Sequence, residues 1–208
     1  MIGEFMKLKC APQITEHQGI LDCSAEDETF LIQKARLGDN ASFALLVARY
    51  REKLYRIIYW MTRHEEDTLD LLQDTFMNAY LSMHKLKDPG IFSRWITKIA
   101  VNLSINHIKR KQRIRKVQER LKYECEPFQK NHLPEKIVEQ NELKDRLADL
   151  IDRLPGKQKS VFVLCDIEGY SYKETAAILQ CNIGTVMSRL FYARTFIRER
   201  WDSELNHP

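Results

Sequence analysis

Side chains suited to a nucleic acid recur along one segment of the chain. Cations and amides stand there at four-residue intervals, at Arg94, Lys98, Asn102, Asn106 and Arg110. A repeat of four places them along one face of a helix, where cations suit phosphate groups and amides suit base edges. A basic run over 109–116 continues this stripe and favours nucleic acid, because each cation near a phosphate releases counterions. The alternative is a solvated helix end that the helix dipole stabilises.

The segment 171–198 has the pattern of a helix-turn-helix. Ser171 and Glu174 form a capping box that begins a short helix, and the helical pattern breaks at Gln180-Cys181-Asn182, where Asn tolerates the geometry of a turn. The second helix has a predicted buried face, at Val186, Leu190, Ala193 and Ile197. Its other face carries mostly polar and basic side chains, at Thr185, Met187, Ser188, Arg189 and Tyr192. In a helix-turn-helix such a helix enters the DNA major groove; the alternative is a helical hairpin inside a core.

A polar face is predicted on the helix over residues 65–86. Four side chains share it, namely Asp70, Gln73, Asp74 and Asn78. A solvated surface is the usual fate of such residues. Met77 and Leu81, however, interrupt this face with apolar side chains, and they favour a surface that binds a partner.

Apolar residues recur with helical periodicity through most of the 208 residues, and no segment alternates in the manner of a strand. We therefore predict an all-α protein with two small helical domains joined by a flexible linker, the second containing the helix-turn-helix. Its expected parts are a flexible N-terminal arm over 1–23, a first domain over 24–114, a linker over 115–134 and a second domain over 135–204. The linker is predicted because the periodicity fades before Pro134.

Composition excludes several functional classes. The net charge is only +4, so the distribution of charge matters more than its total. No apolar run could span a membrane and no signal peptide is evident, so we expect a cytoplasmic protein without membrane insertion. Of the five cysteines, two lie near a histidine, but Cys10, His17 and Cys23 match no common zinc spacing. We find no pattern of a catalytic triad or phosphate loop, and expect no cofactor, no metal and no enzyme activity.

Three blocks of the sequence together resemble the extracytoplasmic-function group of bacterial RNA polymerase sigma factors. They read DLLQDTFMNAY, FSRWITKIAVNLSINHIKRKQR and LPGKQKSVFVLCDIEGYSYKETAAILQCNIGTVMSRLFYAR. The resemblance extends from about Phe30 to Arg198. It implies a subunit that binds the beta and beta-prime subunits of core RNA polymerase, recognises the −10 and −35 promoter elements and promotes DNA melting. It also implies an anti-sigma partner, and no catalysis by the chain itself.

The resemblance further implies which residues form each surface. Core polymerase would bind the polar face of Asp70, Gln73, Asp74 and Asn78. The −10 element would contact a second set, at Lys87, Phe92, Arg94, Trp95, Lys98, Asn102, Asn106, Lys109, Arg110 and Arg113. The −35 element would contact a third set, at Ser171, Lys173, Thr185, Met187, Ser188, Arg189, Phe191 and Tyr192. A base flipped out of the non-template strand would stack on Phe92 or Trp95, whose spacing also fits a core.

The sequence departs from the family pattern in the helix-turn-helix. Members of the family often have Lys or Arg where Met187 and Tyr192 stand, and Gly where Gln180 stands. Two missing cations weaken phosphate or guanine contacts, and Met187 suits a thymine methyl group instead. Two other hypotheses stay open on the sequence. A stand-alone helix-turn-helix regulator would bind duplex DNA without polymerase, and a helical adaptor without nucleic-acid function would leave the cationic stripe unexplained.

Overall fold

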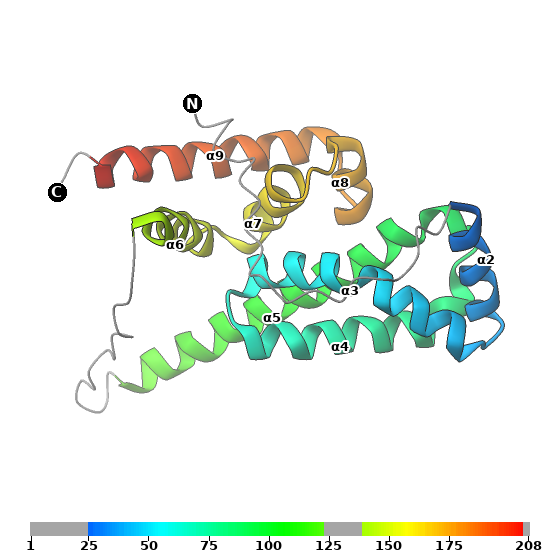
Figure 1. Ribbon diagram of the computed structural model, residues 1–208. Coiled ribbons are helices and arrows are strands. Elements are labelled where there is room, and N and C mark those ends of the chain that lie inside the picture. Colours follow the sequence, from blue (N-terminus) through cyan, green and yellow to red (C-terminus); the bar gives the residue numbers. More distant parts are fainter. Residues whose placement is uncertain (1–24, 123–138, 206–208) are drawn as a thin grey trace.

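The structure is a computed structural model that describes residues 25–122 and 139–205. Every regular element in these two ranges is a helix (Figure 1), which confirms the all-α prediction. The first region contains α2 (Ala25–Arg36), α3 (Asn40–Thr62), α4 (Glu65–Ser82), the 3₁₀ turns η1 (Met83–Lys85) and η2 (Pro89–Ile91), and α5 (Phe92–Lys122). The second contains α6 (Glu139–Asp152), α7 (Gly156–Phe162), the π-helical turn η3 (Val163–Ile167), α8 (Tyr172–Leu179) and α9 (Ile183–Leu205).

Local capping fixes where the central helix α3 begins and ends. Asp39 precedes it, and the backbone N–H of Ser42 donates to Asp39 Oδ2 at 3.2 Å. This bond satisfies one of the amides that a helix start leaves without a partner. Hydrogen bonding by Ser42 also holds the pKa of the Asp39 carboxyl below its usual value. At the other end Arg63 adopts a left-handed conformation, with a φ of 55°, and the chain turns into α4.

One apolar cluster holds the first region together. Helices α3, α4 and α5 lie side by side with α2 against α3 (Figure 1). Their facing side chains are buried, among them Ile32, Leu46, Tyr50, Leu54, Ile58, Leu72, Ala79, Phe92, Ile96 and Ala100. The rings of Tyr50 and Phe92 meet edge to face, with 5.2 Å between their centroids. Removing these side chains from water is the main favourable contribution to folding.

The second region has its own apolar cluster around α9. Helices α6, α7 and α8 contact α9, and the cluster includes Leu150, Ile151, Val161, Phe162, Ala176, Val186, Leu190, Ala193 and Ile197. The predicted buried face of α9 is therefore confirmed. Between α7 and α8 the chain passes through η3 and bends at Gly169, whose φ of 74° lies in the left-handed region that favours glycine. This bend lets α8 return against α9.

A third apolar cluster joins the two regions. The first region contributes Ile57, Met61 and Val101. The second contributes Val163, Leu164, Tyr170 and Ile178. All seven are buried, and we call them the interdomain cluster. In Figure 1, α7 and α8 lie between α9 and the pair formed by α3 and α5. The two helical regions therefore pack directly against each other in this conformation.

The helix α5 is longer than the sequence suggested. We expected the linker to start at residue 115, yet α5 continues to Lys122 and carries the whole basic run. The predicted N-terminal arm, the rest of the predicted linker and the first residues of the second domain lie outside the described ranges. So do Cys10, His17 and Cys23. Among the described helices, none combines the length and apolarity needed to cross a membrane.

Two leucines of α3 provide a test of the core. Leu54 is 0% exposed and Leu45 is 45% exposed. Leu54→Ala is expected to lower the free energy of unfolding by about 3 kcal/mol, because buried methyl groups are lost and a cavity remains. Leu45→Ala, the matched control, is expected to cost less than about 1 kcal/mol. Urea denaturation followed by circular dichroism measures both values, and equal losses would contradict the core face assigned to α3.

Candidate nucleic-acid interface

The helix-turn-helix begins with the capping box that its sequence predicts. The backbone N–H of Glu174 donates to Ser171 Oγ at 3.2 Å, and the N–H of Ser171 donates to Glu174 Oε2 at 2.9 Å. The Ser171 hydroxyl also donates to Glu174 Oε2 at 2.7 Å, and the hydrogen bonds from the Ser171 side chain and backbone lower the pKa of the Glu174 carboxyl, because they stabilise its charged form. The reciprocal pair fixes the first turn of α8 and so the angle at which the chain enters the motif.

The turn between α8 and α9 lies at residues 180–182, where the sequence predicts it. Gln180, rather than Asn182, adopts the left-handed conformation, with a φ of 50°. The backbone N–H of Cys181 donates to the Ala176 carbonyl at 3.1 Å and closes the end of α8. Left-handed backbone costs a residue with a Cβ roughly 1–2 kcal/mol. This cost is a physical reason for the glycine of the family pattern at position 180.

The exposed face of α9 carries most of the residues predicted to read DNA. Met187, Phe191 and Tyr192 are 53%, 65% and 64% exposed. Ser188 is also exposed, but its hydroxyl donates to the Thr185 carbonyl at 3.1 Å within the helix. Among the remaining members of the set, the N-cap residue Ser171 and Lys173 on α8 are exposed, and Thr185 and Arg189 on α9 are half-buried. Large apolar side chains therefore dominate the reading face.

A bidentate ion pair fixes the orientation of α9. Arg194 donates from Nε to Asp166 Oδ2 at 2.9 Å and from Nη2 to Asp166 Oδ1 at 2.5 Å. The Asp166 side chain is almost buried, so the pair is shielded from solvent on one side. Hydrogen bonding to Asp166 raises the pKa of the Arg194 guanidinium. Because Asp166 belongs to η3, the contact locks α9 to the π-helical turn.

The structure places most of the predicted −10 set on one exposed face of α5. Arg94, Asn102, Asn106, Lys109, Arg110 and Arg113 are exposed, Lys98 is half-buried, and Lys87 is exposed in the turn before η2. Phe92 is the exception. It is 0% exposed inside the first region, so the expectation that it stacks on a flipped base is corrected to a core role. Trp95 is half-buried beside it, with 5.8 Å between ring centroids.

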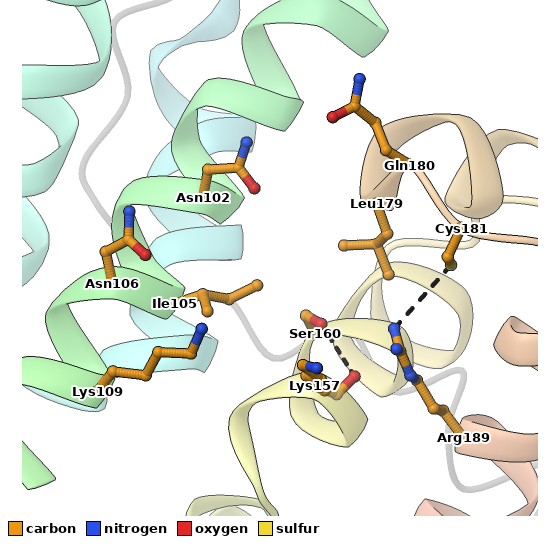
Figure 2. A pocket seen from close by; sticks show the side chains of 10 residues that line it. All are labelled: Asn102, Ile105, Asn106, Lys109, Lys157, Ser160, Leu179, Gln180, Cys181 and Arg189. Carbon is orange, nitrogen blue, oxygen red and sulfur yellow. Dashed lines mark hydrogen bonds between the residues drawn. The ribbon is translucent and has the colours of Figure 1, made fainter.

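The side of α5 next to this exposed face meets the second region. The hydroxyl of Tyr170 lies 3.1 Å from that of Thr97, and because Thr97 donates its proton to the Ser93 carbonyl at 2.8 Å, Tyr170 is the donor. Farther along α5, Asn102, Asn106 and Lys109 line a groove whose opposite wall includes Arg189 of α9 (Figure 2). Residues predicted to contact the −10 and −35 elements are thus brought together across one groove.

The predicted polymerase-binding face of α4 is open. Asp70, Gln73, Asp74 and Asn78 are all exposed. The apolar side chains of Leu69, Met77 and Leu81 are exposed on the same helix. The polar set takes part in local contacts within α4: Asn78 Nδ2 donates to the Asp74 carbonyl at 2.9 Å, and the Ser82 hydroxyl donates to the Asn78 carbonyl at 2.5 Å. A polar face with exposed apolar side chains among it suits a protein partner better than solvent alone.

Sequence analysis missed the polar contacts that join the two regions. Arg56 donates two hydrogen bonds to Glu168, from Nε to Oε1 and from Nη2 to Oε2, each at 3.2 Å. Lys159 is buried, and its Nζ donates to Asp152 Oδ1 at 2.7 Å and to the Met61 carbonyl at 3.4 Å. No local pattern marks these residues, because their partners come from distant parts of the chain.

No metal centre forms among the described residues: they contain no group of three His, Cys, Asp or Glu side chains that could hold an ion. Cys165 and Cys181 are free thiols. Cys165 packs against the second apolar cluster, and burial raises the pKa of its thiol. A neutral, half-buried thiol is a poor nucleophile and a poor ligand.

Two family models match this chain. The model described as Sigma-70 region 2 matches residues 46–114, which include the α4 face and the stripe of α5. The model described as Sigma-70, region 4 matches residues 144–197, which include the helix-turn-helix. The three surfaces described above therefore lie within the two matched segments.

Curated and solved proteins agree with these matches. The chain is 32% identical over 178 residues to the ECF RNA polymerase sigma-E factor of Haemophilus influenzae, covering 82% of this chain and 93% of that protein. It is 30% identical over 175 residues to the ECF RNA polymerase sigma-E factor of Escherichia coli, covering 80% and 90%. Among solved structures, CnrH in complex with the cytosolic domain of CnrY is similar, with a TM-score of 0.61 and 25% identity over 85% of this chain and 97% of that chain.

The left-handed turn provides a test of the motif's geometry. Gln180→Gly is expected to raise the free energy of unfolding by about 1 kcal/mol, because glycine adopts this conformation without a Cβ clash. The matched control is Ala177→Gly in the exposed interior of α8, which is expected to lower it by about 1 kcal/mol. Thermal and urea denaturation measure both changes. A loss of stability in Gln180→Gly would mean that residue 180 is not left-handed.

Proposed function

Because the chain belongs to the extracytoplasmic-function group of RNA polymerase sigma factors, we propose a division of its sigma-factor role among three surfaces. The family acts in transcription initiation, binds core RNA polymerase and DNA, and is not enzymatic. In the proposed division, the α4 face binds core polymerase, the α5 stripe contacts the −10 element, and the exposed face of α9 contacts the −35 element. The cationic stripe within the segment matched by Sigma-70 region 2 is the observation that carries this proposal.

The chemistry of α5 suits a DNA strand that is being opened. Arg94, Lys98, Lys109, Arg110 and Arg113 supply cations for phosphates, and Asn102 and Asn106 supply amide donors and acceptors for base edges. Trp95 is half-buried, so its exposed part can support a flipped base. In this proposal the surface promotes DNA melting, and polymerase carries out the synthesis of RNA.

The chemistry of α9 suits contacts with thymine. Met187, Phe191 and Tyr192 expose large apolar surface where other family members often carry cations. The C5-methyl group of thymine is the apolar feature of the major groove. Ser171 and Lys173 on α8, with Thr185, Ser188 and Arg189 on α9, then position the motif against the DNA backbone.

The arrangement in which the two regions pack against each other, which we call closed, implies an opening step. Asn102, Asn106 and Lys109 face the second region across the groove. Promoter binding at both elements therefore requires the two regions to move apart, and core polymerase would hold them at the spacing of the promoter. We also propose an anti-sigma factor that covers the polymerase-binding faces, and a cytoplasmic location, where core polymerase and promoter DNA are found.

The first test is transcription with purified core polymerase. The protein is expected to co-purify with core polymerase and to direct RNA synthesis from defined start sites. A stand-alone regulator predicts tight binding to duplex DNA in the absence of polymerase, which a gel-shift measurement detects. The proposal is contradicted if the chain neither joins the polymerase nor directs a promoter-dependent start.

A charge reversal tests the α5 stripe. Arg110→Glu is expected to reduce promoter-dependent initiation roughly tenfold, because it removes a phosphate contact and adds repulsion. Arg51→Glu on α3 is the matched control, an exposed arginine outside the three proposed surfaces. Run-off transcription at several salt concentrations measures initiation, and core binding is measured separately. Equal activity of the two variants would rule out a role for the stripe in DNA binding.

A missing methyl group tests the α9 face. Replacing each thymine of the −35 element in turn by deoxyuridine removes one methyl group, and at the contacted position initiation is expected to fall roughly fourfold. In Met187→Ala the same base change is expected to have little further effect, because the contact is already lost. Open-complex formation is measured for the four combinations of unmodified or Met187→Ala protein with thymine or deoxyuridine in the promoter. If the effects of the two changes are additive at every position, Met187 does not contact a thymine methyl group.

A further inference from the structure

The groove between the two regions has the volume of a small-molecule site and a lining made mostly of polar side chains. Its volume is about 390 Å³, within the range of roughly 300–1,000 Å³ typical of ligand pockets. It is lined by Asn102, Ile105, Asn106, Lys109, Lys157, Ser160, Leu179, Gln180, Cys181 and Arg189 (Figure 2). The first four come from α5, and the rest come from the second region. Neither region alone forms the groove.

The charge of the groove is entirely positive. Lys109, Lys157 and Arg189 come from three different helices, and no carboxylate is among the residues that line it. In Figure 2, Lys109 extends from α5 towards the second region, and Arg189 rises from α9 on the opposite side. Within the described residues, Arg189 Nη1 donates a hydrogen bond to Cys181 Sγ at 4.0 Å. Three cations gathered in this way raise the local concentration of anions.

The uncharged lining adds specificity to this charge. The amides of Asn102, Asn106 and Gln180 offer donors and acceptors, and none of the three side chains forms a recorded hydrogen bond within the described ranges. Ile105 and Leu179 supply apolar walls from opposite regions. Amides can bind the polar edge of an organic group while apolar walls contact its faces. The lining therefore suits an organic anion better than a simple inorganic ion.

We propose that this groove binds a small phosphorylated organic anion that bridges the two regions. The phosphate groups are held by Lys109, Lys157 and Arg189, and the organic part lies against the amides and the apolar walls. This site goes beyond promoter recognition, and the binding of the anion does not depend on the proposed DNA contacts. Because the groove exists only when the regions are packed together, the anion stabilises the closed arrangement by mass action.

Lys157 makes the site separable from the proposed DNA and polymerase surfaces. It lines the groove and is exposed, but it belongs to none of the three surfaces. Lys157→Gln removes one of the three cations and keeps a long polar side chain. Lys34→Gln is the matched control, since Lys34 is an exposed lysine on α2, away from the groove. Lys109→Gln tests the cation on the other wall.

The test uses the full chain and inorganic pyrophosphate as the probe, by isothermal titration calorimetry at constant ionic strength. One saturable site per chain is expected, and both Lys157→Gln and Lys109→Gln are expected to weaken binding roughly tenfold. Lys34→Gln is expected to bind like the unmodified protein. Circular dichroism confirms that each variant is folded. Adenosine diphosphate is expected to bind more tightly than pyrophosphate, because it adds an organic part.

Three results would overturn the proposal. The first is the absence of saturable binding, and the second is an equal loss in Lys34→Gln, which would indicate a general charge effect. The third concerns the source of the phosphate. If a short single-stranded oligonucleotide binds at the same site, more tightly than adenosine diphosphate and with the same dependence on Lys157, the groove is a DNA-backbone site. None of these results changes the outcome of transcription with core polymerase, so the two proposals fail independently.

Discussion

The contact between Arg56 and Glu168 is the constraint on which the arrangement of the two regions depends. The Glu168 side chain is only 5% exposed, and a carboxylate so shielded is costly unless a cation pairs with it. Arg56 supplies that cation with two hydrogen bonds of 3.2 Å. The pair sits beside the interdomain cluster, where apolar burial provides attraction but no direction. The ion pair therefore selects one docking geometry among the many that apolar contact alone would allow.

The π-helical turn η3 makes this docking possible. Val163 and Leu164 within η3 enter the interdomain cluster, while Asp166 of the same turn binds Arg194 of α9. One five-residue turn thus contacts the first region on one side and α9 on the other. Turns of this kind are frequent at functional sites. Through η3, the orientation of α9 is tied to the packing of the two regions.

Packing of the regions has a consequence for electrostatics. Lys109 of α5 shares the groove with Lys157 and Arg189 of the second region, and like charges repel one another. Apolar burial and the Arg56–Glu168 pair oppose that repulsion. The closed arrangement is therefore sensitive to anything that neutralises the groove or competes for the interface.

The sequence by itself determined the helices, the capping box and the buried face of α9, because these depend on residues only a few positions apart. It also located the exposed α4 face and the α5 stripe through their spacing. Phe92 and the end of α5 were misjudged, since helical spacing alone does not separate a core position from a stacking one or show where a polar helix ends. The Arg56–Glu168 pair, the interdomain cluster and the groove were decided only by tertiary structure. Their members lie far apart in the chain, and no local pattern records which distant surfaces will meet.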